Sequence, residues 1–79
     1  MFVIKKTDEF GNISYFCCLE YHHVYSYMIP CFSTIQDKEQ FQVMLYTNKE
    51  AALSQVPQLE DLMKQLYIGN ECSFEVVKL

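Results

Sequence analysis

Apolar and polar residues alternate along the first part of the chain in the way that β-strands require. Residues 1–6 form an apolar run that ends in two lysines, and the next six residues form a turn segment. Within that turn, Gly11 and Asn12 tolerate positive φ. A period of two then runs from Ile13 to His22. Its more apolar face carries Ile13, Tyr15, Cys17, Leu19 and Tyr21, and its mixed face carries Ser14, Phe16, Cys18, Glu20 and His22. The pattern predicts two strands joined by a turn, with the more apolar face in the core.

The middle of the chain predicts two further strands separated by a loop. Val24–Ile29 is β-branched and aromatic, and Pro30 cannot donate to a ladder, so this third strand should stop there or lie at a sheet edge. Ser33–Gln40 is polar without a sustained period and is typical of a loop, with room for a short helical turn. Phe41–Tyr46 returns to a strand pattern.

A helix is predicted after this fourth strand. Thr47 and Glu50 have the spacing of a capping box, in which each side chain satisfies the other residue's backbone N–H. Pro57 would clash with the carbonyl of Leu53, so we expect a kink or a new helix near Val56. The apolar stripe that follows consists of Leu59, Leu62, Met63 and Leu66, and Gly69 is placed to end the helix.

The last eight residues, Cys72–Leu79, alternate again and predict a final strand. The resulting order is β-β-β-β-α-β in one small domain, residues 1–79. This is an α+β fold, a mainly antiparallel sheet of four to five strands with one proline-broken helix packed on one face. A crossover connection allows the last strand to lie beside the first.

Charge limits the classes of partner. Six lysines, no arginine and ten acidic residues give a net charge of −4, which disfavours direct nucleic-acid binding. An acidic surface suits a basic protein partner, including one whose groove normally holds nucleic acid, although the same charge also simply favours solubility. No apolar run is long enough for a membrane helix, and the N-terminal pattern is not that of a secretory signal. We therefore expect a cytoplasmic protein with reduced cysteines and no membrane partner.

Cysteine and histidine supply the chemically reactive side chains of the chain, which are Cys17, Cys18, His22, His23, Cys31 and Cys72. Their spacing does not match structural zinc sites, because adjacent strand residues such as Cys17 and Cys18 point to opposite faces. No metal or cofactor is therefore assigned. A cysteine nucleophile would also need an orienting group and a water-excluding pocket, which so small a domain rarely builds, so we predict a non-enzymatic protein. The alternative is a metal- or thiol-dependent regulator or enzyme that uses Cys17, Cys18, Cys31 and the histidines, in which Cys17, Cys31 and one histidine could still meet in space.

An aromatic cluster around the junction of the second and third strands predicts a partner-binding surface. It consists of Tyr21, His22, His23, Tyr25 and Tyr27. This composition resembles binding hot spots, and either the helical carboxylates Glu60 and Asp61 or the turn carboxylates Asp8 and Glu9 would meet lysine or arginine of a basic partner. The alternatives are that the aromatic residues only pack on the sheet, or that they bury against a second copy in a structural homodimer.

Several segments resemble small accessory proteins of phages and mobile elements. They are the opening Phe2–Phe16, the strand Phe41–Tyr46 before Thr47-Asn48-Lys49-Glu50-Ala51-Ala52, and the closing Phe74–Val77. That group includes anti-CRISPR and other anti-defence inhibitors. The resemblance implies a small, acidic, non-enzymatic inhibitor that binds one large nucleic-acid-handling host complex, in the host cytoplasm if the protein is phage-encoded.

Overall fold

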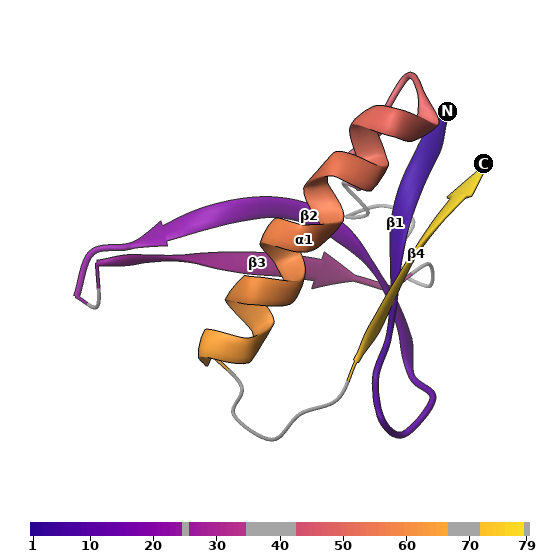
Figure 1. Ribbon diagram of the computed structural model, residues 1–79. Helices are drawn as coiled ribbons and strands as arrows, with labels where there is room; N and C mark the ends of the chain where they lie inside the picture. Colours follow the sequence, from indigo (N-terminus) through magenta and orange to yellow (C-terminus); the bar gives the residue numbers. More distant parts are fainter. Residues whose placement is uncertain (25, 35–42, 67–71, 79) are drawn as a thin grey trace.

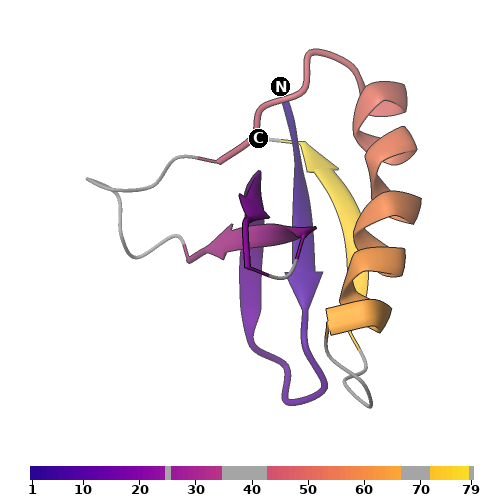
Figure 2. The ribbon, with the colours of Figure 1, turned by 90° about the vertical axis from the view of Figure 1, so that its left-hand side faces the viewer.

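The computed structural model describes residues 1–24, 26–34, 43–66 and 72–78, which form four strands and one helix (Figure 1). The elements are β1 (Phe2–Thr7), β2 (Ile13–His22), β3 (Tyr27–Ser33), α1 (Lys49–Leu66) and β4 (Ser73–Lys78). The strands form one antiparallel sheet in the order β3-β2-β1-β4, and α1 covers one of its faces (Figure 2). The α+β prediction is confirmed, and the last strand does lie beside the first.

The turn between β1 and β2 is organised by the carboxylate of Asp8. Its Oδ1 accepts hydrogen bonds from the backbone N–H groups of Phe10 (2.9 Å) and Asn12 (2.8 Å). The bond from Asn12 has the largest effect on Asp8, and together the bonds lower the pKa of its carboxyl group. Gly11 has a φ of 84°, as the sequence predicts for this turn.

The segment before the helix does not form the expected strand over Phe41–Tyr46. Residues 41 and 42 lie outside the described part, residues 43–45 are not in a strand, and Tyr46 forms one isolated bridge with Phe2. The reason lies in β1, which pairs with β2 only through Lys5–Thr7. At the start of β1 the segment bonds to both strands: Tyr46 exchanges hydrogen bonds with Phe2 (2.8 and 2.9 Å), and the Met44 N–H donates to the Phe16 carbonyl (2.9 Å).

A β-bulge in β2 decides which of its side chains enter the core. Phe16 pairs with Phe32 and Cys18 with Cys31, so Cys17 is an extra residue on β2. Phe16 is buried in the cluster under α1, and Leu19 packs against the same cluster. The prediction that the face with Ile13 and Tyr21 forms the core is therefore right for Leu19, after the bulge, and wrong before it, where Phe16 of the mixed face is the core residue. Ile13 and Tyr21 are exposed.

The third strand extends further than its sequence predicts. β3 runs through Pro30, which pairs with Leu19, and ends at Ser33, while Val24 lies in the turn before it. Since β3 is an edge strand, the missing N–H of Pro30 is tolerated, and the edge alternative of the prediction is confirmed.

The helix begins one residue later than the expected capping box would place it. Lys49 is the first helical residue, and the Oδ1 of Asn48 accepts from the N–H of Ala51 at 2.7 Å, so Asn48 rather than Thr47 is the N-cap. Leu59 and Met63 of the predicted stripe are buried, Leu62 is half-buried, and the side chain of Leu66, like Gly69, lies outside the described part.

α1 is one helix with Pro57 inside it, so the separate second helix expected near Val56 is absent from Lys49–Leu66. Ala52, Val56 and Leu59 face the same core cluster and keep helical spacing across the proline. Pro57 is exposed, which places the carbonyl that loses its donor on the solvent side, where water can replace it. No helix within the described residues has the length and apolar character needed to cross a membrane.

Candidate functional site

The hairpin of β2 and β3 extends away from the rest of the sheet as an arm. After Phe16, β2 pairs with β3 in the described part of the chain, from the Cys18–Cys31 pair to the His22–Tyr27 pair. Figure 1 shows this arm passing beneath α1 and continuing well beyond it. The bulge at Cys17 increases the local bend and twist, which carries the arm away from β1 and β4.

The tip of the arm presents apolar and aromatic side chains to solvent. Val24 is 79% exposed and Tyr21 is 52% exposed. His23 is exposed too, and its ring meets the Tyr21 ring edge to face, with centroids 5.3 Å apart and planes at 86°. This contact holds two of the predicted binding residues in one defined arrangement. We name Tyr21, His23 and Val24 the arm tip.

The other predicted aromatic anchors are His22, Tyr25 and Tyr27. The backbone of His22 pairs with that of Tyr27 at the end of the arm, which puts both residues next to the arm tip. Their side chains, and Tyr25 as a whole, lie outside the described part of the chain.

The acidic pair lies on a different element from the arm tip. Glu60 and Asp61 are exposed on α1. Lys64, also exposed, follows Glu60 by four residues, a spacing at which opposite charges on a helix partly balance. The structure thus divides the predicted binding residues between two surfaces, the arm tip and the outer side of α1.

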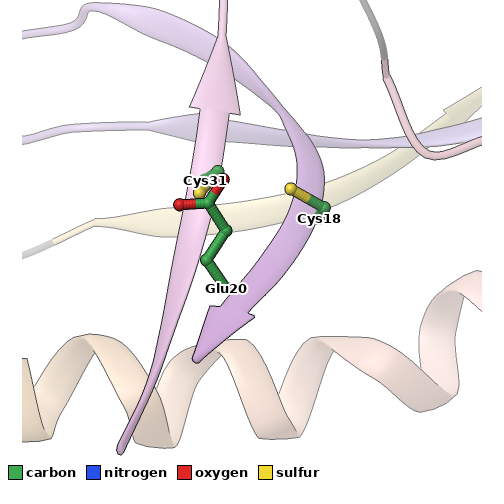
Figure 3. A group of neighbouring side chains, drawn as sticks. All are labelled: Cys18, Glu20 and Cys31. Atoms are coloured by element: carbon green, nitrogen blue, oxygen red, sulfur yellow. The ribbon is translucent and has the colours of Figure 1, made fainter. Parts of the chain in front are cut away.

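A second group of functional side chains lies further back on the arm. The sulfur atoms of Cys18 and Cys31 and a carboxylate oxygen of Glu20 all lie within 4.8 Å of one another. Phe16 and Phe32 face the core, so the Cys18–Cys31 pair that follows the bulge lies on the opposite face of the sheet. Figure 3 shows the Cys18 sulfur pointing across to β3, where the Glu20 carboxylate lies beside Cys31. We name these three residues the thiol–carboxylate cluster.

The thiol–carboxylate cluster favours the protonated form of Cys31. Burial, and then the neighbouring Cys18 and Glu20, raise the pKa of Cys31 to about 11. Cys18 and Cys31 are half-buried, and Glu20 is exposed, so solvent reaches the cluster from the carboxylate side. A thiol held neutral at physiological pH is a poor nucleophile, so Cys31 is not activated as a nucleophile in this arrangement.

The remaining cysteines are separate from this cluster. The thiol of Cys17 donates to the Tyr15 carbonyl at 3.5 Å, and burial raises its pKa. Cys72 precedes β4, and burial raises its pKa as well. All four cysteines carry free thiols. Of the residues in the sequence-based alternative, the structure joins Cys18 with Cys31 and adds Glu20, and among the described side chains Cys17 and His23 are not part of this group.

Two features of the arm were not predicted from sequence. The alternation puts Glu20 on the same face as Cys18, but its convergence with both Cys18 and Cys31 was not predicted. Val24 was assigned to a strand, and only the turn geometry shows that it is exposed at the arm tip.

The chain was compared with known protein families, curated proteins and solved structures. The chain matches no protein-family model, and searches of curated proteins and of solved structures give no match either. Function is therefore inferred from the geometry of the arm itself.

Proposed function

We propose that this protein is a non-enzymatic protein-binding module that docks through the tip of its β2–β3 arm. The observation that carries the proposal is the exposure of Tyr21 and Val24 at the end of a hairpin that projects beyond α1. The apolar surface of these two side chains is unfavourably exposed to water in the free protein. A partner that covers it removes that surface from water, which favours binding. Tyrosine is also among the residues that most often dominate interface energetics.

The arm tip is suited to binding because part of it is ordered before a partner arrives. The backbone of Tyr21 lies in β2, and its ring contacts the ring of His23 edge to face. A side chain that is already fixed loses less conformational entropy on docking than a free one. A pocket on the partner that accepts the Tyr21 ring would therefore gain most of the burial energy of that ring.

Electrostatics support a basic partner. The chain has a net charge of −4, and Asp61 and Glu60 are exposed on α1. Opposite surface potentials accelerate encounter and suppress wrong partners. Together with the resemblance to phage accessory proteins, this leads to the finer proposal of an inhibitor that docks on a nucleic-acid-handling host complex, such as a CRISPR-like defence complex, in the host cytoplasm and without touching nucleic acid itself.

Affinity capture from a lysate of the source cells tests the proposal. Tagged wild-type protein is compared with Tyr21→Ala/Val24→Ala, and the matched control is Phe10→Ala, which removes a side chain that is 81% exposed in the other turn of the same sheet. Wild type and Phe10→Ala should both retain one large nucleic-acid-binding complex, and the arm-tip variant should lose it. Equal retention by all three proteins contradicts docking through the arm tip.

Salt and light scattering separate the remaining alternatives. Raising the salt from about 0.15 M to 1 M shortens the screening length from about 8 Å to 3 Å, so capture by a basic partner should weaken. Salt-independent capture would contradict the electrostatic part of the proposal. A concentration-dependent dimer, with no other protein captured, would instead indicate a structural homodimer, and the arm-tip variant would then show whether the arm forms its interface.

A further inference from the structure

We propose that Cys18, Glu20 and Cys31 form a zinc site on the face of the arm opposite α1. This inference rests on the thiol–carboxylate cluster and is independent of docking through the arm tip. The three side chains come from two adjacent strands whose register is set by the bulge at Cys17. They supply two thiolates and one carboxylate, all of which are ligand types of zinc.

The geometry of the cluster is close to that of a metal site. A zinc ion bound by two thiolates at about 2.3 Å in a tetrahedron holds the two sulfurs about 3.8 Å apart. The three donor atoms of the cluster already lie within 4.8 Å of one another. Bringing the two sulfurs to this separation takes at most about 1 Å, which is within reach of side-chain rotation, and the third donor, Glu20, is exposed. Three protein donors leave one tetrahedral position for water.

The charge balance of the cluster favours a cation. With both thiols and the carboxyl group ionised, the cluster would carry three negative charges on atoms that lie within 4.8 Å of one another. A divalent cation would supply the missing positive charge, and the thiols would release their protons to solvent when it binds.

The donor set selects among cations. Magnesium, calcium and manganese prefer sites made of oxygen ligands alone, whereas two thiolates favour a softer ion. The carboxylate as third donor suits zinc, which accepts sulfur and oxygen together. Because Cys18 and Glu20 are two residues apart on one strand, and Cys31 is the direct cross-strand partner of Cys18, the site needs the β2–β3 pairing to exist. Zinc binding would therefore stabilise the arm, which has only two strands.

Zinc titration of the reduced full-length protein tests this site. Zinc chloride is titrated against a competing chelating dye, and native mass spectrometry counts the bound ions. We expect one zinc per chain. Cys18→Ser and Cys31→Ser should each weaken binding at least about tenfold, and Glu20→Gln should weaken it less, because the amide oxygen can still coordinate. The matched control is Cys17→Ser, which removes the adjacent thiol outside the cluster.

A measurement on the wild type alone guards against variants that fail to fold. Cysteine alkylation is mapped with and without zinc, and zinc should protect Cys18 and Cys31 but leave the reactivity of Cys17 and Cys72 unchanged. The proposal is overturned if folded wild-type protein binds no zinc in a one-to-one ratio. It is equally overturned if Cys17→Ser weakens binding as much as Cys18→Ser, or if zinc protects all four thiols alike.

Discussion

Phe16 and Leu19 lie three residues apart on β2, and yet both pack against the same cluster beneath α1. In a regular strand this spacing would put them on opposite faces, and the extra residue Cys17 removes the conflict. The same bulge turns Cys18 and Glu20 together to the face opposite α1. One irregularity thus shapes the core and the thiol–carboxylate cluster at once.

The core depends on the buried face of α1 far more than on its exposed face. Leu59 is 0% exposed and Leu53, on the same helix, is 48% exposed. Leu59→Ala should lower the free energy of unfolding by about 2–5 kcal/mol, because it removes apolar contacts and leaves a cavity. Leu53→Ala should change it by less than about 1 kcal/mol. Urea denaturation of the two variants tests this, and equal losses would show that α1 is rotated relative to the sheet from the orientation described.

The N-cap of α1 can be tested with neighbouring substitutions. Asn48→Ala removes the oxygen that accepts from the Ala51 N–H and should cost about 1 kcal/mol of stability. Thr47→Ala serves as the control and should cost much less, since Thr47 lies outside the cap. Thermal or urea unfolding of both variants tests this order. If Thr47 capped the helix, as the sequence predicts, Thr47→Ala would instead be the more destabilising of the two variants.

Tyr46 carries a buried hydroxyl with no hydrogen-bond partner among the described residues. Burial raises the pKa of Tyr46 above its ordinary value of 10.0. As the pH rises, Tyr46 therefore loses its proton in the unfolded chain before it does so in the folded protein. Its contribution to the free energy of unfolding is complete below pH 10 and is lost as the pH rises through the pKa of the folded protein. Tyr46→Phe should remove this alkaline loss and, at neutral pH, keep or raise the unfolding free energy by up to about 1 kcal/mol.

The pH dependence of unfolding for wild type and Tyr46→Phe checks this prediction. The two proteins should differ in slope only above about pH 10. A clear destabilisation of Tyr46→Phe at neutral pH would contradict it, because that result would mean that the hydroxyl makes a stabilising bond.

Much of the fold could be predicted from local pattern. The turn at Gly11, the amphipathic spacing of Leu59 and Met63, and the alternation of the last strand each depend on residues close together in the chain. The predictions that were wrong concern contacts between residues that are far apart in the sequence. Phe41–Tyr46 has strand composition, but β1 and β2 separate where it meets them, so Tyr46 forms one bridge instead of a ladder. The bulge was equally hidden, because Cys17 has ordinary strand character.

The candidate site could be predicted only in part for the same reason. The aromatic cluster was visible in composition, and the structure places Tyr21 and His23 together at the arm tip. The separation of Glu60 and Asp61 from the arm could not be seen before α1 was placed on the sheet. The partnership of Cys18 with Cys31 needed the register of β2 against β3, which a shift by one residue would have changed.

The most direct test of docking through the arm tip is the dissociation constant of the purified partner for three forms of the protein. Wild type is compared with Tyr21→Ala and with the control Phe10→Ala, at one salt concentration and after circular dichroism has shown that all three are folded. Loss of a central tyrosine anchor should cost about 2 kcal/mol, a weakening of roughly 30-fold, while Phe10→Ala should stay within about threefold of wild type. Equal affinity of Tyr21→Ala and wild type would contradict the account, as would a larger loss for Phe10→Ala than for Tyr21→Ala.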